Sequence, residues 1–282
     1  MARPAYLAGA IAMTPRRLNW LELIGGAMVL SLVLAAIFAP LIAPHDPTRA
    51  VAATFGDPGA PSMRFPLGTD QLGRDVLSRI IFGARISLVV GVAAMALTMA
   101  IGVTIGLGSG FFGGAVDLIL MRLTDVMLSL PFLLLAMALV AVLRPSLLSV
   151  LLVIGVVSWT QVARVVRAEA MSMTARDFVL AARTLGAPAP RLIVRHVLPN
   201  LLPIIVVMAM LGTSGTLLLE AALSFLGLGV PPPAPSWGRM VAEGTMYFRT
   251  APWLAISPGL AIFYAVLGFN LLGYGVLGRR TR

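Results

Sequence analysis

The sequence predicts an all-α membrane protein, a polytopic bundle of six transmembrane helices. Hydrophobic residues make up 59% of the 282 residues and charged residues only 11%, and the mean hydropathy is +0.96. A soluble domain is roughly half apolar and about one quarter charged. Six stretches of the chain are also long enough, at roughly 20 apolar residues each, to cross the hydrocarbon core of a bilayer as helices.

The expected spans follow one another along most of the chain. In order, they cover residues 21–43, 86–108, 115–143, 147–163, 201–226 and 254–277. Because lipid offers no hydrogen bonds to the backbone, each span is expected to be helical, with a kink at any internal proline. The prolines inside the third, fifth and sixth spans are Pro131, Pro203 and Pro258. The first apolar run follows two arginines as in a signal peptide, but it is longer than a signal core and is expected to remain as a span.

The spans divide the chain into simple parts. Residues 1–20 form an N-terminal tail, and residues 44–85 form a long loop after the first span. The other five spans make a core at residues 86–277, which includes a second long loop at residues 164–200. Residues 278–282 form a short C-terminal tail.

The arginines predict the orientation of these parts. All 21 basic residues are arginines; 13 of them fall on the side of both termini and the 164–200 loop, and 8 fall on the opposite side. Loops rich in arginine remain on the cytoplasmic side of a membrane, so both termini are expected to be cytoplasmic. The net charge of +10 is then explained by orientation, and we expect contact with the lipid bilayer but no nucleic acid partner.

Composition excludes several chemistries. The chain has no lysine, which excludes a phosphate-loop lysine and a Schiff base. It has no cysteine and only two histidines, His45 and His196, so we expect no metal, no cofactor and no catalytic residue. Ser214 lies in a G-T-S-G sequence typical of some intramembrane proteases. His196 is too distant to activate it, at about 27 Å along a helix.

The loop at residues 164–200 contains the strongest functional signal. Thr174 and Asp177 have the spacing of a capped helix start, and Gly186 follows as a stop, which predicts a helix over residues 174–185. Four apolar residues recur on one face of this helix. They are Phe178, Ala181, Ala182 and Leu185. This stripe would either bind another protein or pack on the bundle of its own chain.

Other residues suggest sites within or beside the membrane. Glu220 ends a long apolar run, which predicts a role at a pore or a subunit interface. Residues 75–85 mix charged and apolar residues at helical spacing, which predicts an amphipathic helix on the outer membrane surface, either an anchor or a landing site for a soluble partner. Arg122 and Asp125 are spaced to form an ion pair. The glycines at residues 102, 106 and 110 allow another helix to approach closely.

The 164–200 loop also resembles that of a known family. Residues 180–199 read L-A-A, three residues, G, nine residues, then H-V-L-P. This sequence is similar to the E-A-A-x3-G-x9-I-x-L-P loop of permease subunits of bacterial ABC importers. Leu180 replaces the glutamate of that loop and His196 replaces the isoleucine. Residues 195–200, R-H-V-L-P-N, are similar to the corresponding run of the dipeptide, oligopeptide and nickel branch.

Two outer segments resemble the same branch. Residues 67–79 read L-G-T-D-Q-L-G-R-D-V-L-S-R, and residues 220–238 include E-A-A-L-S-F-L-G-L-G followed by P-P-A-P-S-W-G. The resemblance thus extends over residues 67–237, in matching order and spacing. The C-terminus departs from it, because residues 273–278 read G-Y-G-V-L-G where the family usually has G-D-x-L-R-D and several further residues.

The resemblance implies a fold, a function and partners. It implies the type I ABC importer permease fold and the C-type subunit of the complex, in a bacterial inner membrane. The implied partners are a second permease subunit in a heterodimer, ATP-binding subunits on the cytoplasmic side and an extracytoplasmic binding protein. The chain would not be an enzyme, because its partners would hydrolyse the ATP. It would form half of the translocation path for short peptides delivered by the binding protein. Nickel or another small solute is the alternative cargo, and a proton-coupled secondary carrier is the alternative class.

The resemblance also implies contact residues. The docking contact with the ATPase would involve Arg176, Asp177, Phe178, Leu180, Ala181, Ala182, Leu185 and Gly186. Contact with the binding protein would involve Asp70, Arg74, Asp75 and Trp237. The first set lies in the cytoplasmic loop and the second set in the two outer segments.

Overall fold

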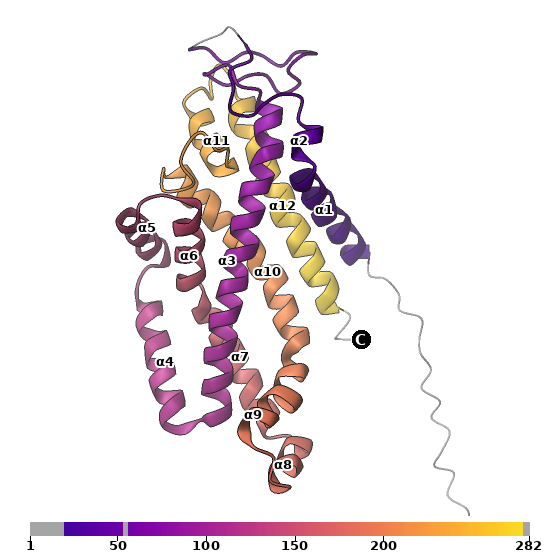
Figure 1. Ribbon diagram of the computed structural model, residues 1–282, viewed down its shortest axis with the longest axis vertical. Coiled ribbons are helices and arrows are strands. Elements are labelled where there is room, and N and C mark those ends of the chain that lie inside the picture. Colours follow the sequence, from indigo (N-terminus) through magenta and orange to yellow (C-terminus); the bar gives the residue numbers. More distant parts are fainter. Residues whose placement is uncertain (1–19, 53–55, 279–282) are drawn as a thin grey trace, which may run out of the picture.

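The computed structural model describes residues 20–52 and 56–278, which form an elongated bundle of helices (Figure 1). In chain order the elements are α1 (Trp20–Ile37), α2 (Ala39–Ile42), α3 (Val76–Phe112), α4 (Gly114–Ser129), α5 (Phe132–Leu143), α6 (Leu147–Val157), α7 (Trp159–Thr174), α8 (Asp177–Thr184), α9 (Ala189–Leu192), the π-helical turn η1 (Ile193–Val197), α10 (Leu198–Phe225), α11 (Trp237–Thr245) and α12 (Trp253–Gly278). The predicted all-α class is confirmed.

The described residues contain five helical segments that are long and apolar enough to cross a membrane. These are α1, α3, the run from α6 through α7, the run from α9 through α10, and α12. Helices α4 and α5 supply a sixth span when they are counted together, although they are bent by 86° at the break between them. The six predicted spans are therefore found in the described chain, and the third of them is broken.

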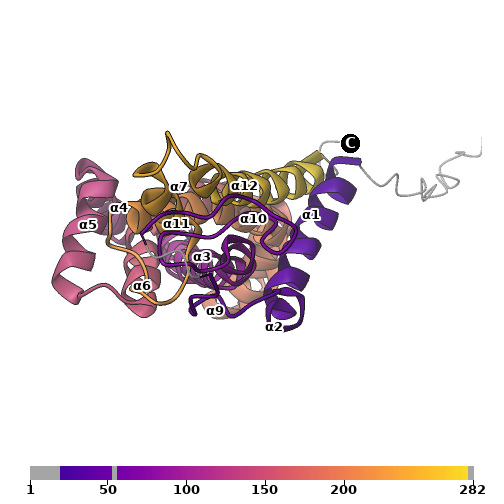
Figure 2. The same cartoon turned by 90° about the horizontal axis from the view of Figure 1, so that it is seen from above.

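The two ends of the bundle are different. The loop after α2 and helix α11 lie at one end, and α8 lies at the other (Figure 1). Helix α1 runs from the α8 side of the bundle toward this loop, and α12 runs back toward the α8 side. The N-terminal end of α1 and the C-terminal end of α12 therefore face the same side. Figure 2 shows α4 and α5 at one edge of the bundle and α1 at the opposite edge.

The second span begins earlier than predicted. The carboxylate of Asp75 accepts a hydrogen bond from the backbone N–H of Ser78 at 3.1 Å and so caps α3, which then continues for 37 residues without a break. At 1.5 Å per residue this helix is about 55 Å long, against about 30 Å for the core of a bilayer. The prediction of a separate interfacial helix at residues 75–85 is wrong, because these residues are the first turns of α3.

Glycines set the distance between α3 and α7. A Cβ atom added to Gly106 would lie 2.6 Å from the carbonyl oxygen of Ala163, and one added to Gly102 would lie 2.6 Å from the Cβ of Val162. No side chain fits at such distances, so the two helices are packed backbone to backbone. The predicted close approach of another helix at these glycines is confirmed, and that helix is α7.

The predicted kinks have different outcomes. Pro131 lies at the break between α4 and α5, whereas Pro203 and Pro258 lie inside α10 and α12, which continue past them. The fourth span also differs, because it extends to Thr174 rather than ending at residue 163. Residues 164–174 of the predicted 164–200 loop therefore belong to helix α7.

Candidate functional site

Helix α8 begins after the predicted cap. Thr174 ends α7, and its hydroxyl donates to the carbonyl oxygen of Met171 at 2.9 Å. The chain turns at Arg176, which has extended backbone and whose carbonyl accepts from the N–H groups of Val179 and Leu180. The prediction that Thr174 caps the functional helix is wrong, because Thr174 is the last residue of α7. The functional helix therefore covers the eight residues Asp177–Thr184.

Gly186 ends this helix as predicted. Its φ of +83° lies in the left-handed region, which side chains with a Cβ rarely adopt. The N–H of Gly186 donates to the carbonyl of Arg183 at 3.0 Å, and the N–H of Ala187 donates to the carbonyl of Ala182 at 3.1 Å. This is the hydrogen-bond pattern that closes a helix through a left-handed glycine.

Only one side of α8 is anchored to the bundle. Val179 is completely buried, while Phe178 and Leu180 are each nearly half exposed and Ala181 is exposed. Ala182 is half-buried. Leu185, just past the end of the helix, is 88% exposed. The predicted apolar stripe therefore faces outward, which favours binding of a partner over packing on its own bundle.

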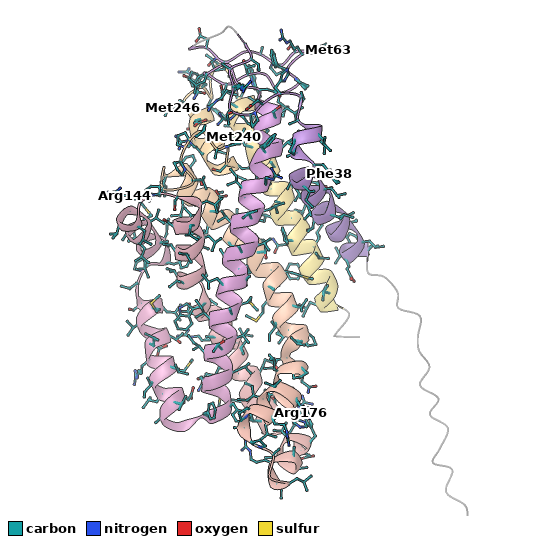
Figure 3. All side chains as sticks on the ribbon, viewed as in Figure 1. Phe38, Met63, Arg144, Arg176, Met240 and Met246 are labelled. Atoms are coloured by element: carbon teal, nitrogen blue, oxygen red, sulfur yellow. The ribbon has the colours of Figure 1, made fainter. Side chains whose placement is uncertain are left out.

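Charged and aromatic contacts support the edge of this surface. The guanidinium carbon of Arg183 lies 5.5 Å from the centroid of the Phe111 ring, a cation–π contact with the end of α3. The rings of Phe178 and His196 are 6.4 Å apart. Arg176 is exposed at the tip of the molecule (Figure 3). The exposed arginines around the stripe are Arg176, Arg183, Arg191 and Arg195. They form a basic rim with Asp177 among them.

Two ion pairs join α7, the helix before α8, to α4. The guanidinium of Arg167 donates through Nε and Nη2 to the two carboxylate oxygens of Asp117, at 2.5 and 2.6 Å. The hydroxyl of Ser109 on α3 donates to the same carboxylate. Arg164 donates to Asp125 at 2.7 Å. The predicted pairing of Asp125 with Arg122 is wrong, because α4 turns its acidic residues toward the arginines of α7.

Glu220 is buried within the helical bundle. Its side chain is fully buried between α10 and α3. The hydroxyl of Ser224 donates to one carboxylate oxygen at 2.7 Å, and the hydroxyl of Ser87 donates to the other at 3.0 Å. Any effect of Glu220 on a pore or a subunit interface would therefore act through the position of α10 against α3.

The outer segments form a buried ionic cluster. Asp70 pairs with Arg74 at 2.7 Å and with Arg79 at 2.9 Å. Glu243 of α11 pairs with Arg79 at 3.1 Å and with Arg239 at 2.9 Å. Sequence reasoning missed Arg79, Arg239 and Glu243 as members of this site. The mixture of charges in residues 75–85 was the available signal, and it was interpreted as a membrane-surface helix.

The residues expected to contact a binding protein are buried. Asp70, Arg74, Asp75 and Trp237 are all nearly or fully inaccessible. Trp237 donates its indole N–H to the carbonyl of Ile80 at 2.9 Å, and Asp75 caps α3. These four side chains therefore offer little accessible area to a soluble partner, and their contact with a binding protein stays a prediction. Their role in the structure is to hold the outer end of α3 against α11.

Comparison with known proteins identifies the family. Residues 102–281 match the family described as binding-protein-dependent transport system inner membrane component. The chain belongs to this family of permeases. Residues 17–59 match a second description, the N-terminal transmembrane domain of oligopeptide transport permease C. The permease is thus a multi-pass membrane transport subunit and not an enzyme, and permeases of its family function with ATPase and binding-protein components.

The permease is similar to curated relatives over most of its length. It is 39% identical to the dipeptide transport system permease of Alkalihalophilus pseudofirmus, covering 92% of this chain and 84% of the relative. It is 43% identical to the di/tripeptide transport system permease of Pseudomonas aeruginosa, covering 90% and 85%. It is 38% identical to the oligopeptide transport system permease of Bacillus subtilis, covering 94% and 86%. The predicted family resemblance is confirmed.

Proposed function

We propose that the permease is half of the translocation path of an ATP-driven importer of short peptides. The names of its relatives support this cargo, since those described above transport dipeptides, di- and tripeptides or oligopeptides. A nickel or other small-solute importer has the same architecture but less support from these names. A proton-coupled secondary carrier has no use for an exposed docking helix. The outward-facing apolar stripe of α8 carries the proposal.

In this function α8 docks into a groove of a partner ATPase, which hydrolyses the ATP. An exposed apolar surface on a short, singly anchored helix requires a partner to cover it. The basic rim would attract acidic residues around such a groove and set the orientation of docking. Phe178, Leu180, Ala181 and Leu185 would make the contact, with Ala182 at its inner edge. Arg176, Asp177 and Gly186 would hold the helix in position.

Movement of the ATPase would reach the membrane through α7. Helix α8 follows α7 after a turn of two residues, and Arg167 ties α7 to α4. A displacement of α8 would therefore move α7 and α4 together, and α4 leads into the bent third span. The path would switch between inward-open and outward-open states by this rigid movement.

The orientation and the second subunit are also proposals. The excess of arginine on the side of α8 supports a cytoplasmic position for α8 and both termini, in a bacterial inner membrane. Few polar residues are available in six apolar spans to line a pore, which supports a second, different permease subunit opposite this one. A binding protein would deliver the peptide to the outer end, where the α3 and α11 ends are held by the ionic cluster.

Purification of the complex through a tag on the permease tests docking. Leu185→Asp and Ala182→Glu place charge in the apolar stripe, and Gly186→Leu strains the left-handed turn, so we expect loss of the ATPase from the purified complex. Met246→Asp is a matched control, because Met246 is also 83% exposed but lies at the opposite end (Figure 3). Retention of the ATPase by all three α8 variants would overturn the docking proposal.

Peptide uptake tests the cargo separately. The wild-type complex in proteoliposomes, with its binding protein outside and ATP inside, should accumulate a labelled dipeptide. An intact complex that hydrolyses ATP but accumulates nickel, and no dipeptide or tripeptide, would overturn the peptide assignment. If the purified permease carries no ATPase and still accumulates the peptide, the secondary carrier becomes the better explanation.

A further inference from the structure

A cavity of about 560 Å³ lies halfway along the bundle. Its walls come from the middle of α3, the middle of α10 and two interruptions of the spans. One interruption is the 86° bend between α4 and α5. The other is Ser158, the single residue between α6 and α7, where the span from Leu147 to Thr174 nonetheless continues as one helix. Broken helices at membrane depth occur where their backbone is buried in protein or lines a watery cavity. The volume of this cavity is in the range typical of small-molecule sites.

Three polar side chains of the α6–α7 break are available to a solute. The side chains of Ser158, Thr160 and Gln161 line the cavity, and within the described part of the chain none of the three makes a side-chain hydrogen bond. Thr160 is nonetheless almost completely buried. Ser158 is half-buried and Gln161 is exposed, so these polar groups remain accessible to a solute. These three groups can therefore form hydrogen bonds with a solute in the cavity.

Two other hydroxyls in the same wall are already engaged. Thr98 donates to the carbonyl of Gly155 at 3.2 Å, and Thr216 donates to the carbonyl of Gly91 at 2.8 Å. All five polar residues line the same cavity, and they differ in whether their side chains are already hydrogen-bonded within the chain. Thr98 and Thr216 hold helices together, whereas Ser158, Thr160 and Gln161 do not.

The chemistry of the lining restricts what it can select. Among the residues that the structure describes, no charged side chain lines the cavity, and the rest of the wall is apolar. An amide and two hydroxyls can both donate and accept hydrogen bonds, as required to replace water around a neutral peptide group. Such a wall recognises the backbone amide that peptides share and does not distinguish acidic from basic side chains.

We propose that this cavity is a transient binding site for the backbone of the transported peptide, with Gln161 as its main contact. The inference rests on the proposed function and adds to it the site on the path. Gln161 lies on α7 in the wall of the cavity, and Arg167 is about 9 Å further along the same helix. Movement of α7 by the ATPase would therefore displace the amide of Gln161 and release the peptide.

Uptake by reconstituted complexes tests the contact. Gln161→Leu removes the amide at similar volume, and the loss of one hydrogen bond should lower the efficiency of dipeptide uptake about 5- to 10-fold. The amount of ATPase that co-purifies with the permease should not change. Thr98→Val is unsuitable as a control because its hydroxyl joins helices, so the matched control is Met208→Leu, an apolar substitution in the same wall. Wild-type uptake by Gln161→Leu would overturn the site.

A substrate change makes the test specific. A dipeptide methylated on its amide nitrogen has no N–H to donate to the side-chain oxygen of residue 161. If this hydrogen bond forms, the methylated peptide should be transported equally by the wild type and by Gln161→Leu, once binding-protein affinity has been matched. An equal loss for both peptides would indicate a structural role for Gln161 and would overturn the proposal.

Chemical protection supplies a readout besides uptake. The chain has no cysteine, so Gln161→Cys introduces a unique thiol. A water-soluble thiol reagent should modify it in the complex, and a peptide-loaded binding protein with ATP should slow the reaction. Leu134→Cys, on the exposed surface of α5, should show no such protection. A thiol at position 161 that reacts in the isolated chain but not in the complex would show that the second subunit fills the cavity, which overturns the peptide site without affecting the importer assignment.

Discussion

Arg167 of α7 holds Asp117 of α4 through two hydrogen bonds, from Nε to Oδ1 at 2.5 Å and from Nη2 to Oδ2 at 2.6 Å. The planar guanidinium matches both carboxylate oxygens, which makes this the most specific type of ion pair. It joins α7, the helix before the proposed docking helix α8, to α4, the first half of the bent span. Arg164 and Asp125 join the same two helices through a single hydrogen bond, and both side chains are about half exposed.

We predict that Arg167→Ala uncouples transport while Arg164→Ala has little effect. The first variant leaves a partly buried carboxylate without its charged donor, at a cost of about 1.5–3 kcal/mol, and α4 then no longer follows α7. The second variant removes an exposed pair that contributes at most about 1 kcal/mol. The measurement is the ratio of peptide uptake to ATP hydrolysis in proteoliposomes. Similar ratios for both variants would contradict a transmitting role for Arg167.

The spacing of α3 and α7 leads to a prediction about two glycines two residues apart. Gly106→Ala would place a Cβ 2.6 Å from the carbonyl oxygen of Ala163, so the helices must separate and the melting temperature in detergent should fall. Gly108→Ala meets only a methyl group of Leu120 at 3.8 Å. It should leave stability unchanged or raise it by up to about 1 kcal/mol, because alanine favours helix. A melting temperature of Gly106→Ala equal to or above that of Gly108→Ala would contradict the observed packing.

The ionic cluster should contribute to stability through Arg79. Its side chain is only 2% exposed and lies between the buried Asp70 and the partly buried Glu243. Arg79→Ala leaves these carboxylates with Arg74 and Arg239, and the loss of the charged hydrogen bonds should cost about 1.5–3 kcal/mol. Arg49→Ala is the control, because Arg49 is 82% exposed and its pair with Asp46, at 3.5 Å, is worth at most about 1 kcal/mol. Thermal unfolding of the two purified variants distinguishes them. Equal melting temperatures would contradict a stabilising role for the cluster.

Local features of the chain were enough to predict the spans and the docking helix. A run of roughly 20 apolar residues requires a helix in lipid whatever its neighbours are. The left-handed stop at Gly186 and the four-residue recurrence of apolar positions also depend on residues close in sequence. The family motifs are equally local, because they are short runs with fixed spacing. Thr174 was misjudged because the same spacing that suggests a cap can lie inside the end of a preceding helix.

Tertiary structure alone decided which partner each polar residue found. Asp125 could pair with Arg122 on its own helix, but the close packing of α3 on α7, and of α4 beside both, brings Arg164 nearer. Asp70 and Glu243 are 173 positions apart and meet on Arg79 because α11 folds back against α3. The cavity at Gln161 likewise requires the bend between α4 and α5 to lie beside the junction of α6 and α7. Backbone periodicity is set within a few residues, whereas pairing and burial depend on contacts that form only when distant helices pack.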